Sequence, residues 1–201
     1  MAYQFFEGRN AMVKIGIICE GPTEEILFLS ENFKKLLAVN NLSLVNVINA
    51  QGSGNLLPHN RDIHVQSLQL DGAEKVLIIT DLDTDACITL TKKRIDAENE
   101  IIVIIAVKEI ESWFLASTET MRKILKQEAF EFPFPEKELE PFETVNRLLF
   151  TNLGRGIGKK SSGKINLVNS LLNAGLDISQ AASHPNCPSA AYFINKLTSL
   201  T

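Results

Sequence analysis

The chain has 201 residues, of which 45% are hydrophobic and 22% charged, a composition typical of one globular domain and not of a disordered or fibrous protein. Its net charge of −4 gives no overall attraction to nucleic acid, so local cations or a bound metal would have to hold a polyanion. The longest strongly apolar run, residues 101–107, is far shorter than the roughly 20 residues that cross a bilayer, so we expect no membrane segment.

The cysteines and the amino terminus indicate the compartment. Cys19, Cys87 and Cys187 are odd in number and have no paired spacing, which disfavours a disulfide framework and suits a reducing cytoplasm. The first residues lack a basic start, an apolar stretch and a small-residue cleavage site, so no signal peptide is expected. We expect a cytoplasmic protein in which residues 1–12 are an amino-terminal extension.

Strands and helices alternate along the first two thirds of the chain. Apolar, β-branched runs predict strands at 13–19, 44–50, 75–80 and 101–107. Segments with helical spacing follow them at 22–39, 56–70, 86–97 and 112–127. Apolar strands separated by helices indicate a parallel sheet that is covered on both faces. We therefore predict a Rossmann-like α/β core of about four strands over residues 13–127.

The remainder of the chain has a different character. Residues 128–143 are rich in proline and glutamate, which predicts an irregular surface excursion. Helical pieces are expected at 145–149, 164–172 and 190–197. We interpret residues 128–201 as an excursion and a helical appendage packed on the core.

Carboxylates follow three of the four predicted strands. The carboxyl ends of parallel strands meet at one edge of a sheet, where ligands bind in such folds. Acids brought together there repel one another and raise one another's pKa, and a divalent cation removes this conflict. Hard oxygen ligands suit Mg²⁺ or Mn²⁺. The acids are Glu20, Asp81, Asp83, Asp85, Glu109 and Glu111.

Some of the acids also have structural explanations. Asp85 precedes a predicted helix and would serve as its cap, and Glu24 and Glu25 lie in a first helical turn, where the helix dipole favours acids. Asp81 and Asp83 resist such explanations, because two acids directly after a buried strand do little for stability. We interpret these two as functional.

Three motifs in order carry a family resemblance. "CEGPTEE" follows the first strand, "TDLDTD" the third and "KEIESWFLA" the fourth. Together they resemble the Toprim fold, which is shared by topoisomerases, bacterial primases and the overcoming-lysogenization-defect nucleases. The chain looks closest to small stand-alone bacterial Toprim-like proteins, over roughly residues 13–125.

The resemblance implies roles for individual residues. Glu20 matches the Toprim glutamate, a general acid or base that also helps to place a metal, and Glu24 matches the second acid of the nuclease-type pattern. Asp81 and Asp83 match the metal-binding pair, which makes Glu20, Asp81 and Asp83 the expected catalytic residues. The full set of expected ligands to Mg²⁺ or Mn²⁺ is Glu20, Glu24, Asp81, Asp83, Asp85, Glu109 and Glu111.

The implied activity is metal-dependent phosphodiester cleavage of DNA or RNA, in phage defence or nucleic-acid processing. The sequence shows no attached ATPase domain, zinc ribbon or tyrosine domain, which disfavours topoisomerase and primase activity. An ATPase partner is conceivable by analogy with nucleases of this fold.

A basic stretch lies between the predicted helices of the tail. Arg155, Lys159, Lys160 and Lys164 would neutralise phosphates along a nucleic-acid strand, although a solvated loop has the same composition. The stretch also approaches a nucleotide-binding loop, but Ile165 stands where Ser or Thr is needed and no strand precedes it. We therefore expect no ATP site there.

Two other functions stay open. "DLDTD" is similar to the start of haloacid-dehalogenase phosphatases, in which the first aspartate, here Asp81, is the nucleophile. In that family the aspartates usually follow the first core strand, whereas here they follow the third. The other alternative is a Toprim-shaped module that binds a partner without catalysis.

Overall fold

The structure is a computed structural model that describes residues 12–95 and 101–201. Its sheet has four parallel strands in the order β2-β1-β3-β4, which confirms the predicted α/β class and strand number. The predicted extension over residues 1–12 lies outside the described residues except for Met12. The strands are β1 (Val13–Cys19), β2 (Leu42–Asn49), β3 (Lys75–Asp81) and β4 (Ile101–Ala106).

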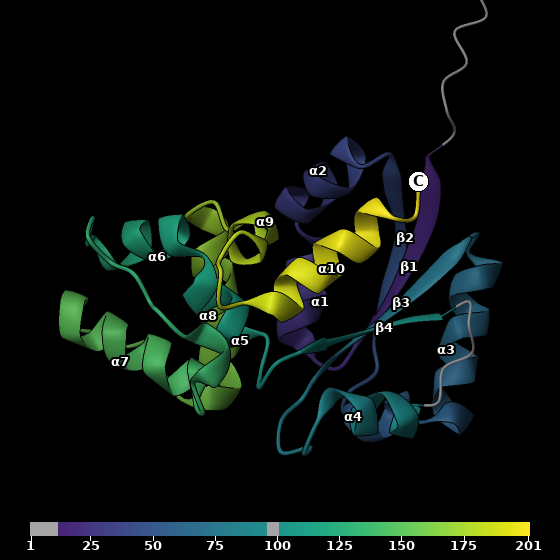
Figure 1. The fold of residues 1–201 in the computed structure, drawn as a ribbon, viewed down its shortest axis with the longest axis horizontal. Helices are drawn as coiled ribbons and strands as arrows, with labels where there is room; N and C mark the ends of the chain where they lie inside the picture. Colours follow the sequence, from purple (N-terminus) through teal and green to yellow (C-terminus); the bar gives the residue numbers. More distant parts are fainter. Residues whose placement is uncertain (1–11, 96–100) are drawn as a thin grey trace, which may run out of the picture.

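Helices cover both faces of the sheet (Figure 1). One face carries α3 (Pro58–Leu70) and α4 (Ile88–Ile95), which begins within the predicted helix at 86–97. The end predicted for that helix lies outside the described residues. The other face carries α1 (Pro22–Leu29), α2 (Glu31–Val39) and α10 (Pro188–Thr198).

Successive residues of each central strand face opposite layers. Ile17 and Ile79 belong to the core beneath α1, α2 and α10, whereas Ile18 and Ile78 belong to the core beneath α3. All four are at most 1% exposed. Burial on both faces is why these strands are continuous apolar runs in the sequence.

Serines break two of the predicted helices. At Ser30 the hydroxyl accepts a hydrogen bond from the amide of Phe33, so a new helix begins there and the predicted helix 22–39 becomes α1 and α2. The predicted helix 112–127 is likewise two helices, α5 (Glu111–Ala116) and α6 (Thr118–Leu125), separated by Ser117. The hydroxyl of Ser117 donates back to a carbonyl group four residues earlier.

The tail is built from helices that join the main core. Its helices before α10 are α7 (Pro141–Leu153), α8 (Lys160–Asn173) and α9 (Ile178–Ala182), of which α9 was not predicted. The predicted excursion over 128–143 has a turn at 128–129 and a 3-10 helix at Pro135–Lys137, and its last three residues belong to α7. Buried side chains of α8 and α10 share one hydrophobic cluster with β1 and β3, so the appendage is packed on the sheet layer.

The length and polarity of the helices bear on membrane crossing. Within residues 12–95 and 101–201, none of the helices is both long and apolar enough to cross a bilayer.

Candidate active site

A cleft of about 570 Å³ lies at the carboxyl ends of β1, β2 and β3. This is the edge at which parallel α/β sheets bind their ligands. Three of the predicted acids and one of the predicted cations reach it. Its lining is Glu20, Gly21, Pro22, Thr23, Glu24, Asn49, Gln51, Gly52, Asp81 and Lys164.

Glu20 joins the ends of β1 and β3. It follows the last residue of β1, and its Oε2 accepts hydrogen bonds from Thr80 Oγ1 at 2.7 Å and from the amide of Asp81 at 3.4 Å. Gly21 then turns the chain into α1, with Pro22 at the start of that helix. A side chain at Gly21 would place its Cβ 3.2 Å from Glu24 Oε2, so glycine keeps this carboxylate close to the strand end.

Asp81 and Glu24 are buried acids in the same cleft. Asp81 is 8% exposed, and its Oδ1 accepts a hydrogen bond of 2.9 Å from the amide of Ile110. Burial, and then the charges of Glu24 and Glu111, raise the pKa of Asp81 well above its ordinary value. Burial also raises the pKa of Glu24, and the charge of Glu20 raises it further. Burial and the neighbouring acids therefore both oppose ionisation of these two carboxyl groups.

Lys164 is the cation of this region. It extends from α8, and its Nζ lies 3.3 Å from Glu109 Oε2 and 3.2 Å from Glu111 Oε2. Burial opposes the charge on Lys164, but Glu111, Glu109 and Asp81 together raise its pKa above the ordinary value. Lys164 is therefore an ammonium ion at neutral pH.

Glu111 is the most deeply placed of these acids, with a side chain that is 0% exposed. Its Oε1 lies 3.1 Å from Lys164 Nζ, yet no hydrogen bond is aligned with that oxygen. Burial raises the pKa of Glu111 to about 7, with Glu109 adding to the rise and Lys164 opposing it. The ammonium group of Lys164 thus pairs with both carboxylates, and Glu111 Oε1 is left without a hydrogen bond.

The other two acids of "DLDTD" lie away from the cleft lining. Asp83 is exposed, has a φ of +48°, and donates its amide to the carbonyl group of Lys108. Asp85 accepts a hydrogen bond of 2.8 Å from Thr91 and forms an ion pair of 2.9 Å with Arg94, both in α4. Asp85 therefore has the structural role of anchoring this helix, and metal binding by Asp83 and Asp85 stays a prediction.

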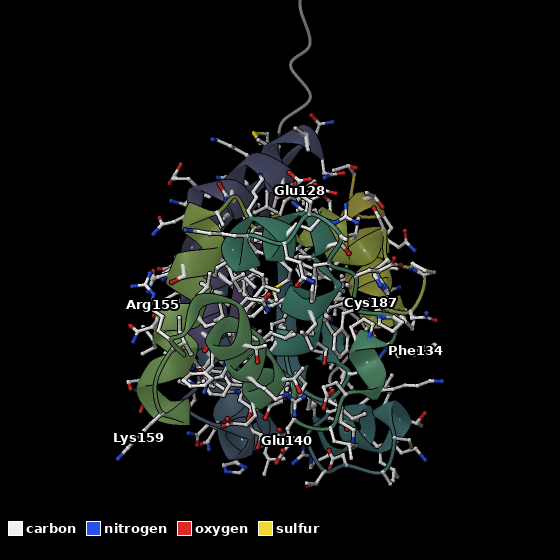
Figure 2. The ribbon with its side chains drawn as sticks, turned by 90° about the vertical axis from the view of Figure 1, so that its left-hand side faces the viewer. Glu128, Phe134, Glu140, Arg155, Lys159 and Cys187 are labelled. Carbon is white, nitrogen blue, oxygen red and sulfur yellow. The ribbon has the colours of Figure 1, made fainter. Side chains whose placement is uncertain are left out.

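The predicted basic group is divided in space. Arg155 and Lys159 are exposed, and Figure 2 shows them along one side of the molecule with their side chains directed outward. Lys160 begins α8, but its side chain lies outside the described residues. Of the three whose side chains the structure describes, Lys164 alone lines the cleft. Phosphate binding by the exposed members stays a prediction.

Several residues of the cleft were not predicted from the sequence, among them Asn49 and Gln51. Asn49 is the last residue of β2 and Gln51 lies two residues beyond it, so the rule that ligands bind at the carboxyl ends of parallel strands would have found them. Asn49 donates a hydrogen bond of 2.9 Å to Glu25 and accepts one from the amide of Gln51. These contacts fix the β2 side of the cleft, which is separated by β1 from Asp81 of β3.

The sequence also contains a pattern that predicts the position of Lys164. The buried face of α8 carries apolar residues three, four and seven positions after Lys164, so helical spacing places the lysine on that face and not in a loop. These residues are Leu167, Val168 and Leu171, each 0% exposed.

The donor set of the cleft fits a hard divalent cation. Glu20, Glu24 and Asp81 offer carboxylate oxygens, the ligands that Mg²⁺ and Mn²⁺ prefer. A bound cation would also favour the ionised forms of Asp81 and Glu24, which burial and the neighbouring acids disfavour. Among the described residues, no three His, Cys, Asp or Glu side chains are placed so that they hold an ion as they stand. An ion would therefore have to draw the carboxylates together.

Comparison with known proteins adds no family to this description. The chain matched no family model, no curated protein and no solved structure. The resemblance to Toprim proteins accordingly stays a prediction from the sequence motifs.

Proposed function

We propose that this protein is a divalent-metal-dependent nuclease that cleaves phosphodiester bonds in DNA or RNA. The observation that carries the proposal is that carboxylates from the ends of two neighbouring parallel strands share one cleft with a carboxylate of α1 and an ammonium group of α8. Carboxylates that hold a cation, beside a fixed positive charge, complement the charge that develops on a phosphate during transfer.

The residues of the chain take distinct roles in this proposal. Asp81 and Glu24 are ligands, and Glu20 is a ligand or proton carrier whose orientation is set by its hydrogen bond from Thr80. The hydrogen bond from Ile110 fixes one oxygen of Asp81 and so orients the carboxyl group. A bound Mg²⁺ or Mn²⁺ would supply an activated water and offset charge on the phosphate. Asp83 is not among the residues that line the cleft, and its part as a ligand stays a prediction.

The partners follow from the same proposal. Nucleic acid is the substrate, and the exposed Arg155 and Lys159 are proposed to hold its phosphates. Work with an ATPase partner in phage defence is the biological setting that the Toprim resemblance implies.

The test is incubation of the purified protein with plasmid DNA and with structured RNA, in Mg²⁺ or Mn²⁺ and in chelator. Cleavage is expected with metal and not with chelator. An Asp81→Asn variant purified in parallel controls for contaminating nucleases, because it should be inactive. Intact DNA and RNA together with hydrolysis of a generic phosphomonoester would replace the proposal by the haloacid-dehalogenase alternative. Turnover of neither substrate would favour a binding module.

A further inference from the structure

We propose that Lys164 occupies the place of a second metal ion, so that the protein binds one divalent cation, among Glu20, Glu24 and Asp81, and not two. The inference rests on the metal site of the proposed function and settles its stoichiometry. It starts from the observation that the acids of this region fall into two groups.

The two groups differ in what they contact and in whether they reach the cleft. Glu109 and Glu111 lie within 3.3 Å of the Lys164 ammonium, and neither is among the described residues that line the cleft. Glu20, Glu24 and Asp81 do line it, and Lys164 lies on the same lining. Lys164 therefore stands between the cleft and the Glu109–Glu111 pair.

The ammonium and an ion would compete for the same oxygens. A metal bound to Glu109 and Glu111 would lie about 2.0–2.6 Å from oxygens that Lys164 Nζ now contacts at 3.1–3.3 Å. The side chain of Glu111 is 0% exposed and that of Lys164 is 22% exposed, so little solvent screens two such cations from each other. One carboxylate pair in this environment accommodates one cation.

Lys164 cannot readily leave this position. Its helix face carries Leu167, Val168 and Leu171, each 0% exposed, and these residues pack in the core shared with β1 and β3. The backbone of α8 is thereby fixed, and the lysine stem emerges next to the acids. Withdrawal of the ammonium would also leave the buried carboxylate of Glu111 without a counter-charge, which disfavours it strongly.

The experiment counts Mn²⁺ ions per chain, by equilibrium dialysis or by the electron paramagnetic resonance signal of free Mn²⁺. We expect one ion for the wild type and two for Lys164→Met, which removes the ammonium but keeps an apolar stem of similar length. Lys164→Arg keeps the charge and should bind one. Lys35→Met is the matched control, because it removes an exposed lysine of α2, and it should also bind one.

Each result has a distinct meaning. Two ions on the wild type would overturn the inference and leave the nuclease proposal standing, whereas no ion would overturn the nuclease proposal itself. A folded Lys164→Met protein that binds one ion would also overturn the inference. If that variant does not fold, Glu111→Gln decides the matter. An unchanged Mn²⁺ affinity would support the inference, and a tenfold loss would show that Glu111 is a ligand.

Discussion

The acids of the motif "DLDTD" occupy different environments in the structure. Asp81 is the last residue of β3, lies in the cleft and is 8% exposed. Asp83 and Asp85 follow within four residues, yet one is exposed and the other is bound to α4. The ladder of the sheet fixes the position of a strand's last residue, whereas the turn beyond it has already changed direction at Asp83, where φ is +48°. Short spacing in sequence is therefore no guarantee of a shared site.

The basic stretch divides in the same way. Lys159 and Lys164 are five positions apart, but only Lys164 lies on the buried side of α8, and only Lys164 contacts the acids. In each motif the candidate functional residue belongs to a regular element at the sheet edge: Asp81 ends β3, and Lys164 lies on α8. The following changes test this division.

The largest effect is expected for Asp81→Asn. The amide keeps an acceptor for the Ile110 hydrogen bond but removes the charge, so cleavage should fall by at least ~100-fold. In the absence of metal, relief of the buried charge should raise stability by about 1 kcal/mol, or roughly 2–4 °C in unfolding temperature for a chain of this size. Assays of plasmid cleavage and thermal unfolding measure the two effects.

Asp83→Asn is the matched control for that change, since it removes the same charge two residues away. Its cleavage rate should stay within ~10-fold of wild type. An equal loss in both variants would make Asp83 a ligand and remove the contrast between the two halves of the motif.

The second effect concerns stability and pH. Burial raises the pKa of Glu111 from its ordinary value of 4.5 to about 7. Between these values the folded protein retains a proton that the unfolded chain has lost. The stability from this group is therefore full below about pH 4.5 and declines as the pH rises to 7. Glu111→Gln should remove that decline, which is on the order of 3 kcal/mol.

Denaturant unfolding of wild type and Glu111→Gln across this pH range measures the difference. Glu128→Gln, which changes an exposed glutamate, should keep the wild-type profile. Parallel profiles for wild type and Glu111→Gln would mean that the acid is not held protonated by its surroundings.

A smaller effect is expected for Asp85→Asn. The change weakens the half-exposed ion pair with Arg94 and the hydrogen bond from Thr91, which together should cost about 0.5–1 kcal/mol in the free energy of unfolding. Urea titration measures this cost, and cleavage should be unchanged. Loss of cleavage at unchanged stability would instead place Asp85 among the metal ligands.

The smallest effect is expected at the exposed end of the basic stretch. If Lys159 contacts one phosphate, Lys159→Ala should lower the slope of binding affinity against salt by about 0.7–0.9, while Mn²⁺ affinity stays the same. Lys35→Ala, which also removes one exposed positive charge, should leave the slope unaltered. A slope equal to wild type for Lys159→Ala would mean that this part of the stretch is merely solvated.

The sequence predicted the sheet well because its strands are buried on both sides. The runs at 75–80 and 101–107 have no polar alternation, and they form β3, a central strand, and β4, an edge strand of the parallel sheet. The breaks at Ser30 and Ser117 were not predicted, because a serine hydroxyl bonds to the backbone without disturbing the apolar spacing around it.

The site was predicted in part. Glu20 and Asp81 were found because a strand end fixes each of them, and Glu24 entered only through the family resemblance. Its burial depends on the angle at which α1 leaves the strand, which the local sequence does not specify. Lys164 was grouped with the basic stretch, at the start of the predicted helix 164–172. Its contacts with Glu109 and Glu111 were not predicted, because they join segments more than 50 residues apart. Such long-range contacts follow from packing and not from local pattern.

The contact between Lys164 and the acids also sets an order of events during protein synthesis. Lys164 is translated 83 residues after Asp81, which at about 5–20 residues per second is a delay of several seconds. Throughout that interval the nascent chain contains Glu20, Glu24 and Asp81 but lacks Lys164. The ammonium group of Lys164 is the counter-charge of Glu109 and Glu111 in the folded protein. The sheet edge therefore cannot close in its final form until α8 has left the ribosome, and a product truncated before α8 would retain unbalanced acids at that edge.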